Sequence, residues 1–174
     1  MTTSNAFKID SDLQAELGAN QYLTFFLGGE EYGVNILKVQ EIKGWTDVTP
    51  MPNTPDPVLG VINLRGTVVP IVELRSYFNL PKAARGATTV IIVVKVEDGR
   101  GGTRTLGMVV DSVSEVHNIP GDEIQPPPIG EENDRGVIEG LATVGERMII
   151  LLDIDDLMIN GVLGLARKTA EIHE

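Results

Sequence analysis

Two apolar runs in the middle of the chain, Val58 to Leu64 and Thr67 to Leu74, are separated only by Arg65 and Gly66. Runs rich in β-branched residues on either side of a two-residue, glycine-containing break are typical of a β-hairpin. Glycine readily adopts the positive φ angle of a tight turn, and the turn leaves Arg65 at its tip, where a large cation stays hydrated. The sequence therefore predicts a hairpin with an exposed arginine at the tip.

The same pattern of apolar and polar positions occurs again toward the C-terminus. The residues that correspond share character and spacing, with no gap within each block, which indicates an internal duplication with insertions in loops. The matched pairs are Gly60/Gly140, Val69/Ile149, Ile71/Leu151, Val72/Leu152 and Glu73/Asp153 in one block, and Gly33/Gly107, Val39/Val113, Glu41/Glu115 and Ile42/Val116 in the other.

Further apolar runs predict the other strands. Tyr22 to Leu27 is strand-like, a Gly-Gly pair turns the chain, and Glu31 to Val34 returns. Thr88 to Val96 is apolar at nearly every position, which is typical of a strand buried on both faces. The stretch from Trp45 to Pro57 holds four prolines and is predicted to be an extended loop or sheet edge.

Helical signals are short. Ser11 to Leu17 has the spacing of a capping box and predicts a short helix that ends at Gly18. Asn35 is predicted to cap a helical turn that carries Ile36, Val39 and Glu41. Asp56 and Pro57 form a candidate N-cap and first helical residue. The stretch Asp153 to Asn160 is predicted to be a final helix that stops at Gly161.

Composition narrows the classes of protein. Lys and Arg number 14 against 25 Asp and Glu, a net charge of −11, which repels the phosphate backbone and argues against a nucleic-acid binder. The absence of cysteine excludes disulfides and thiol chemistry. No apolar run reaches the ~18 residues that span a bilayer, and the N-terminus lacks a signal-peptide pattern. A cytoplasmic protein without direct membrane insertion is expected.

Candidate catalytic groups are sparse. The loop Asp98 to Thr103 is glycine-rich but has no P-loop lysine, so an ordinary hairpin loop is the better interpretation. The aspartates that begin at Asp153 match Glu73 in the first repeat and are better explained as strand-end caps than as a metal site. His117 and His173 have no evident nucleophile or carboxylate partner in the sequence. No catalytic residue and no metal site are predicted.

Glu41 and Arg65 are the most interesting charged pair, because both are predicted to lie at exposed turns of the first repeat. Glu41 has a counterpart in Glu115, whereas Gly145 stands where the second repeat would have Arg65. The arginine therefore suggests a task specific to one repeat. The alternative is a solvated turn arginine with no function.

Four segments together resemble the CheW family of bacterial chemotaxis coupling proteins, over about residues 20 to 160. They are EYGVNILKVQEI (31–42), NTPDPVLGVINLRGTVVPIVEL (53–74), LGMVVDSVSEV (106–116) and GERMIILLDIDDL (145–157). The resemblance implies an all-β fold of two small five-stranded barrels of the SH3 or OB type, packed over a shared core, with short helical segments. It also implies no enzymatic activity and no cofactor.

The resemblance further implies partners and a binding surface. Such proteins bridge the CheW-like regulatory domain of the histidine kinase CheA to the cytoplasmic tip of methyl-accepting chemotaxis receptors, in arrays at the membrane. The groove between the barrels receives the receptor tip. The partner-binding residues implied by the matching motifs are Val39, Glu41, Ile42, Gly60, Asn63, Leu64, Arg65 and Gly66.

The expected organisation has an N-terminal tail at 1–19, the CheW-like domain at 20–160, and a C-terminal helix or tail at 161–174. The first barrel is expected at about 20–83 and the second at about 84–156. A repeat of roughly 65 residues holds a weak core, so the two repeats are expected to pack on each other or to exchange strands.

Two other functions stay open at this point. The chain resembles the CheW-like part of a CheV-type protein without its receiver domain. Alternatively, it is a small-ligand-binding β-barrel. A pocket that gathers titratable groups favours a ligand binder, and a shallow apolar groove beside Arg65 favours an adaptor.

Overall fold

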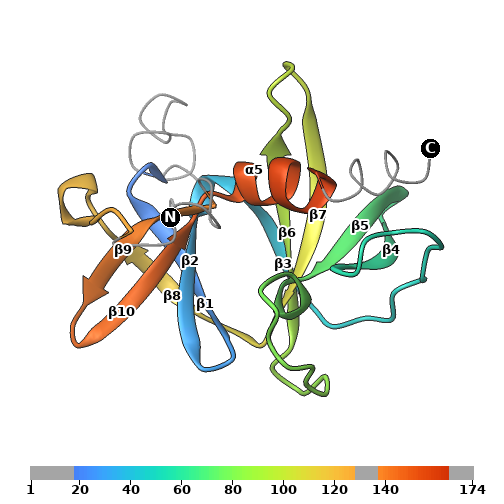
Figure 1. Ribbon diagram of the computed structural model, residues 1–174, viewed down its shortest axis with the longest axis horizontal. Helices are drawn as coiled ribbons and strands as arrows, with labels where there is room; N and C mark the ends of the chain where they lie inside the picture. The colour runs from blue at the N-terminus through green and yellow to red at the C-terminus, as the bar shows by residue number, and fades with distance from the viewer. Residues whose placement is uncertain (1–17, 128–136, 165–174) are drawn as a thin grey trace, which may run out of the picture.

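The computed structural model describes residues 18–127 and 137–164, and in this part of the chain ten strands form two five-stranded sheets (Figure 1). The predicted helix at 11–17 lies outside the described residues. Sheet A has the strand order β8-β1-β2-β10-β9, and sheet B has the order β3-β6-β7-β5-β4. The strands are β1 (Gln21–Leu27), β2 (Glu30–Asn35), β3 (Val39–Gly44), β4 (Val58–Leu64), β5 (Thr67–Glu73), β6 (Val90–Glu97), β7 (Thr103–Val110), β8 (Ser112–Asn118), β9 (Ile138–Val144) and β10 (Arg147–Leu152).

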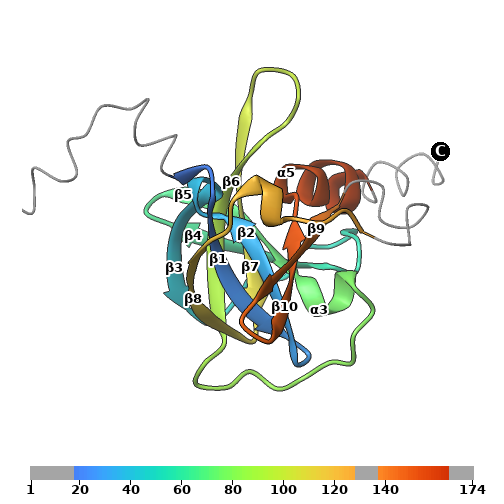
Figure 2. The same ribbon diagram turned by 90° about the vertical axis from the view of Figure 1, so that its left-hand side faces the viewer.

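Each sheet combines strands from both repeats. Strands β1 and β2 pair with β8 and β10 of the second repeat, and β6 and β7 pair with β3 and β5 of the first. The pairs that join the repeats across β2–β10 and β5–β7 are parallel, whereas the hairpin pairs are antiparallel. The two sheets lie side by side, and the turned view in Figure 2 shows sheet A in front.

Each sheet curls so that its two edges meet at a single bridge, not along a continuous ladder. In sheet B, Thr49 and Val61 exchange two backbone hydrogen bonds of 2.9 Å. In sheet A, Gln125 and Leu141 exchange two of 2.8 Å. These bridges join the segments that follow β3 and β8 to the opposite edge strands, β4 and β9. The duplicated fold is therefore an SH3-like pair of incompletely closed barrels, as expected.

Three apolar cores follow from this arrangement. The interior of sheet B holds Ile71 and Ile91 with their neighbours, and the interior of sheet A holds Ile149 and Leu151 with theirs. A larger cluster between the sheets takes side chains from both, together with the helical segment α5 (Ile154–Asp156) and its continuation η3 (Leu157–Val162). In Figure 1 this helical segment lies over the junction of the two sheets.

Strand β6 shows how one apolar run serves two cores. Ile91 and Val93 point into the interior of sheet B, whereas Ile92, Val94 and Val96 join the shared core. All five side chains are fully buried. The prediction of a strand buried on both faces is confirmed, and the shared core expected from the size of each repeat is present.

Several local predictions need correction. Asn35 does cap a turn, since its Oδ1 accepts from Leu37 N at 2.9 Å, but the 3₁₀ turn η1 (Ile36–Lys38) ends before Val39. Val39 and Glu41 lie instead in β3, where pairing with β6 outweighs the helical spacing. Asp56 and Pro57 form a turn and not a helix start, and Val58 N bonds to Pro55 O at 2.9 Å.

Gly161 does not end the final helix, which runs through it as part of η3. A Cβ atom at this position would collide with the ring and hydroxyl of Tyr77, the last residue of α3 (Leu74–Tyr77). The absence of a side chain at Gly161 therefore allows the helical segment to pack closely against Tyr77 of α3, and this packing overrides the helix-ending tendency of glycine. In the part of the chain that the structure describes, no helix is long and apolar enough to cross a membrane.

Candidate partner-binding site

The β4–β5 hairpin of sheet B places Arg65 in its two-residue turn. Arg65 and Gly66 both have positive φ angles, 50° and 87°, as a two-residue type I′ turn requires. Asn63 Oδ1 accepts a hydrogen bond of 2.8 Å from Gly66 N and fixes the turn. The Arg65 side chain is 68 % exposed, so the fold presents the cation to solvent.

Glu41 lies on β3, which pairs with β6 on one side only and is therefore an edge strand. The Arg65 guanidinium donates a hydrogen bond to Glu41 Oε1, although the two residues are far apart in the sequence. This hydrogen bond, and then the charge of Glu41, raise the pKa of Arg65. The Glu41 carboxylate is 25 % exposed. The structure thus brings together the two charged residues that the sequence singled out.

The other predicted residues divide into two groups. Ile42 is 43 % exposed on β3, Asn63 and Gly66 are exposed in the hairpin, and Val39 is half-buried. Leu64 is only 8 % exposed and packs in the interior of sheet B. Gly60 is buried because the backbone of Thr49 passes where its Cβ atom would lie. Gly60 and Leu64 therefore shape the hairpin from inside and do not face a partner directly.

A second glutamate–arginine pair lies on sheet A. Arg147, at the start of β10, places its Nη2 atom 3.7 Å from Glu115 Oε2 on β8. Its Nε atom lies 3.3 Å from Oε1 of Glu31, a carboxylate only 3 % exposed. His117 Nε2 lies 3.4 Å from Arg147 Nη2 and 3.6 Å from Glu115 Oε2. Sheet A therefore also has an arginine beside this glutamate, although Gly145 occupies the turn position that corresponds to Arg65.

Sequence comparison missed Arg147 because it is two positions beyond Gly145, the counterpart of Arg65. The long side chain of Arg147 reaches Glu115, although Arg147 does not occupy the hairpin position that corresponds to Arg65. The signal available in the sequence was a second arginine close to the turn of the second hairpin.

Exposed apolar side chains accompany both pairs. Ile42 and Val68 are 43 % and 63 % exposed on the elements that carry Glu41 and Arg65. Val116 and Met148, 47 % and 58 % exposed, occupy the corresponding elements of sheet A. Exposed apolar residues beside charged groups are typical of interaction surfaces.

A cleft of about 580 Å³ lies where the two sheets meet. Desolvation, and then the negative charge of Asp153, raise the pKa of the Glu139 carboxyl group in this cleft. Its walls come from the turn between β2 and β3, from β6 and β7, and from β9, β10 and α5. The lining residues include Asn35, Leu37, Lys38, Lys95, Glu97, Thr103, Glu139, Leu152, Asp153 and Asp155.

Half of the charged side chains that line the cleft, Lys38, Asp153 and Asp155, are bound to neighbouring protein groups. Lys38 Nζ donates to Asp155 Oδ2 at 2.8 Å, and Asp153 Oδ1 accepts from Asp156 N at the start of α5. Among residues 18–127 and 137–164, no group of three His, Asp or Glu side chains could hold a metal ion. The arrangement is that of a binding protein, with charged pairs and apolar side chains on its surfaces.

The comparisons with known proteins define this class further. The family described as CheW-like domain matches residues 21–160. The chain is 41 % identical over 164 residues to the chemotaxis protein CheW of Klebsiella aerogenes, covering 94 % of this chain and 96 % of that protein. It is 39 % identical over 141 residues to CheW of Rhizobium meliloti, covering 80 % and 88 %.

The fold agrees with a solved relative. The crystal structure of the scaffolding protein TtCheW from Thermoanaerobacter tengcongensis is similar with a TM-score of 0.70 and 33 % identity, over 79 % of this chain and 91 % of that protein. The chain belongs to the CheW-like family. It is a non-catalytic chemotaxis coupling adaptor.

Proposed function

We propose that this chain couples the CheW-like regulatory domain of the histidine kinase CheA to the cytoplasmic tip of methyl-accepting chemotaxis receptors. The observation that carries the proposal is the exposed Arg65–Glu41 pair, held between an edge strand and a hairpin tip. An arginine offers a planar fork of donors to carboxylates or carbonyls of a partner. Its pairing with Glu41 fixes the fork before the partner arrives, which lowers the entropy lost on binding.

The kinase-binding surface in this proposal consists of the exposed members of the predicted set, with Gly60 and Leu64 supporting them from inside. Strand β3 adds unpaired backbone groups along its free edge, and Ile42 adds apolar area. The surface-facing members are Val39, Glu41, Ile42, Asn63, Arg65 and Gly66.

The receptor tip is assigned to the cleft between the sheets. Its volume suits a few side chains of a helical hairpin, and Leu37, 53 % exposed, offers an apolar contact at its rim. The cleft also gathers titratable groups, which is the feature expected of a small-ligand binder. The ligand-binding alternative is weaker because Lys38, Asp153 and Asp155 are bound to neighbouring protein groups.

The proposed partners also imply where in the cell the protein acts. We expect the chain to be cytoplasmic and to be recruited to receptor arrays at the membrane. The CheV-type alternative is not favoured, because the chain is 41 % and 39 % identical to the two CheW proteins described above and only 23 % identical to the CheV3 protein of Helicobacter pylori.

The test combines binding and kinase assays with purified components. The chain is titrated against CheA and against a receptor-tip fragment, alone and together, and kinase activity is followed in each mixture. We expect the chain to bind each partner and to change kinase activity only when the receptor is present. The proposal is wrong if the chain binds neither partner, or if it changes kinase activity equally without receptor.

A further inference from the structure

The described chain passes between the two sheets at two places. It leaves sheet A after β2 and enters sheet B at β3 through the turn η1, and it returns from β7 to β8 through Asp111. A charged residue lies at each crossover, Lys38 at the first and Asp111 at the second. Asp111 is bound to groups on both sides of the junction, and Lys38 is bound to Asp155, whose carboxylate also accepts from sheet B.

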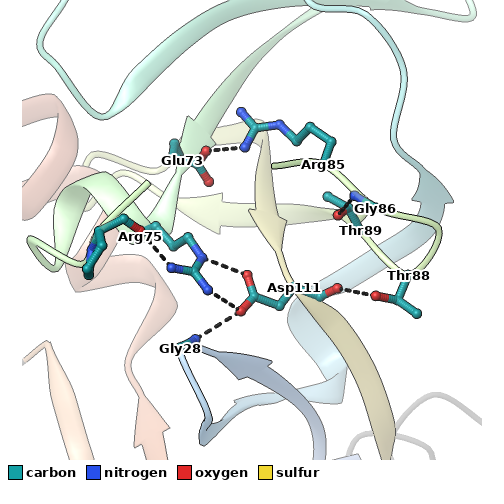
Figure 3. A network of polar contacts seen from close by, with 9 residues as sticks. Gly28, Glu73, Arg75, Arg85, Gly86, Thr88, Thr89 and Asp111 are labelled. Atoms are coloured by element: carbon teal, nitrogen blue, oxygen red, sulfur yellow. Dashed lines mark hydrogen bonds and ion pairs between the residues drawn. The ribbon is translucent and has the colours of Figure 1, made fainter. Parts of the chain in front are cut away.

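Asp111 forms the first tie, hereafter the Asp111 clamp (Figure 3). Arg75 on α3, which follows sheet B strand β5, donates from Nε to Oδ1 at 2.9 Å and from Nη2 to Oδ2 at 2.7 Å. The backbone N–H of Gly28, in the β1–β2 turn of sheet A, donates to Oδ2 at 2.9 Å. The Arg75 hydrogen bonds are the main reason that the pKa of Asp111 lies below its usual range. One carboxylate therefore joins sheet B to sheet A.

Asp155 forms the second tie, the Asp155 clamp. It lies on α5, which follows sheet A strand β10, and its Oδ2 atom accepts from Lys38 Nζ at 2.8 Å. Its Oδ1 atom accepts from the backbone N–H of Glu97, at the end of sheet B strand β6, at 3.0 Å. Again a carboxylate binds one cation and one hairpin N–H across the junction.

The two clamps are related by the duplication, with their charges reversed. Arg75 and Asp155 occupy the same place after the second hairpin of their repeats, and Asp111 and Lys38 occupy the two crossovers. In one clamp the helix supplies the cation and in the other the anion. Two different charge arrangements thus make the same three-way contact, which indicates that the contact itself is what the fold requires at both sites.

We propose that the Asp111 and Asp155 clamps are positioning devices that fix the angle between the two sheets and, through it, the relative placement of the kinase-binding and receptor-binding surfaces. This inference rests on the proposed bridging function. An adaptor that holds two partners at once gains from a fixed geometry, because the second binding event is then intramolecular at a high effective concentration. A bidentate arginine–carboxylate pair is directional and suits that role.

The experiment uses the Asp111 clamp, because Arg75 and Asp111 lie outside the cleft and the hairpin surface assigned to the partners. Asp111→Asn keeps the shape and an acceptor for Gly28 but loses the charge, and Arg75→Gln removes the same pair from the other side. The matched control is Glu73→Gln, which breaks the 2.6 Å Glu73–Arg85 pair within sheet B and its connector (Figure 3).

Two measurements are made on each variant. The chain has no cysteine, so Thr67→Cys and Thr143→Cys, exposed on opposite sheets, give a unique pair of spin-label sites for a distance distribution. The second measurement is the affinity for CheA with and without the receptor-tip fragment, and for the fragment alone.

We expect Asp111→Asn and Arg75→Gln to broaden the distance distribution and to leave each single-partner affinity within about twofold. The gain in CheA affinity caused by receptor should fall by about tenfold or more. Glu73→Gln should change neither quantity. An unchanged distance distribution, or unchanged receptor-dependent gain in folded variants, would overturn the positioning role. If the unmodified chain binds neither partner, the proposed function itself is wrong, and that failure is visible before any clamp variant is compared.

Discussion

Arg147 approaches Glu115 in sheet A as Arg65 approaches Glu41 in sheet B, but the two arginines have different second neighbours. Arg147 also lies 3.3 Å from the buried carboxylate of Glu31, whereas Arg65, in the part of the chain that the structure describes, forms an ion pair with Glu41 alone and is 68 % exposed. Arg147 is therefore tied to the protein interior. Arg65 is held only at the surface, by Glu41, so the two positions should respond differently to mutation.

Stability should depend on the backbone at position 65 more than on the lost charge. Arg65 has a φ of 50°, a conformation that costs roughly 1 kcal/mol for a residue with a side chain, and Gly145 occupies the same turn position at 64°. Arg65→Ala should change the free energy of unfolding by no more than about 0.5 kcal/mol. Arg65→Gly should be about 1 kcal/mol more stable than Arg65→Ala. Urea denaturation of the two variants checks this, and a less stable glycine variant would contradict it.

The affinity for CheA should depend on the side chain at position 65 and not on its backbone conformation. Arg65→Ala and Arg65→Gly should lose the same affinity for CheA, about 2 kcal/mol or roughly thirtyfold, and Arg65→Glu should lose more because it places two carboxylates together. Combining Arg65→Glu with Glu41→Arg should restore stability but not binding. Titration calorimetry against CheA and a receptor fragment measures this. Unchanged affinity of Arg65→Glu for both partners would leave a solvated turn arginine as the correct interpretation.

Replacing Arg147, unlike replacing Arg65, should mainly lower the stability of the fold. Arg147→Gln leaves the Glu31 carboxylate, which is 3 % exposed and makes no hydrogen bond within the described protein, without its cation. The variant should lose about 2 kcal/mol of stability, because a buried charge is then uncompensated. Adding Glu31→Gln removes that charge and should recover most of the loss. Thermal unfolding of the single and double variants measures the coupling, and additive losses would show that the two residues act independently.

The sequence alone was enough to predict the structural elements that show a regular pattern of apolar residues along a strand. The hairpin at Arg65, the duplication and the doubly buried β6 all follow from alternating or continuous apolar residues. The clamps could not be predicted in the same way, because Arg75 and Asp111 meet only through the order of strands in the two sheets. Arg147 was missed because long side chains reach past their own register. Val39 was misassigned to a helical turn because pairing with β6 decides its conformation.

Gly60 and Gly140 should be required for the curl of each sheet. A Cβ atom at Gly60 would collide with the backbone of Thr49, and one at Gly140 would come within 2.7 Å of Gln125 O. Both contacts lie at the bridges that join the sheet edges, so the backbone must move to admit a methyl group. Gly60→Ala and Gly140→Ala should each lose about 2 kcal/mol or more.

The control for these glycines is Gly86→Ala, where nothing lies within 4 Å of the added methyl group. It should be neutral within about 0.5 kcal/mol. Hydrogen exchange should show faster opening at Thr49 and Val61 in Gly60→Ala. Equal stability of all three variants would mean that the bridges do not constrain the sheets.

A fragment ending near Gly86 should not fold alone. It would contain β1 and β2 without β8 and β10, and β3 and β5 without β6 and β7, so each remaining pair would expose its ladder and one face of the shared core. Circular dichroism of residues 1–86 should show no cooperative thermal transition. A cooperative transition would show that the first repeat is stable without strands from the second.

Glu139 and Asp111 should give opposite pH dependences of stability. Desolvation and Asp153 raise the pKa of Glu139, so its ionised form is disfavoured in the folded state, and the native protein carries a penalty once the pH rises through the folded pKa. Glu139→Gln should therefore be more stable than the parent at pH 7. That difference should disappear as the pH falls below the ordinary glutamate pKa of about 4.3, where residue 139 of the parent is neutral in both the folded and the unfolded state.

Asp111 has a lowered pKa, chiefly because of Arg75, so its ionised form is favoured in the folded state. Asp111→Asn should be less stable than the parent at pH 7, and its deficit should shrink only as the pH falls through the depressed folded pKa. Urea midpoints of both variants and the parent, taken at several pH values from 7 downward, give the two signs. Midpoint changes of the same sign at neutral pH would contradict the assignment of one carboxylate as strained by the cleft and the other as stabilised by its clamp.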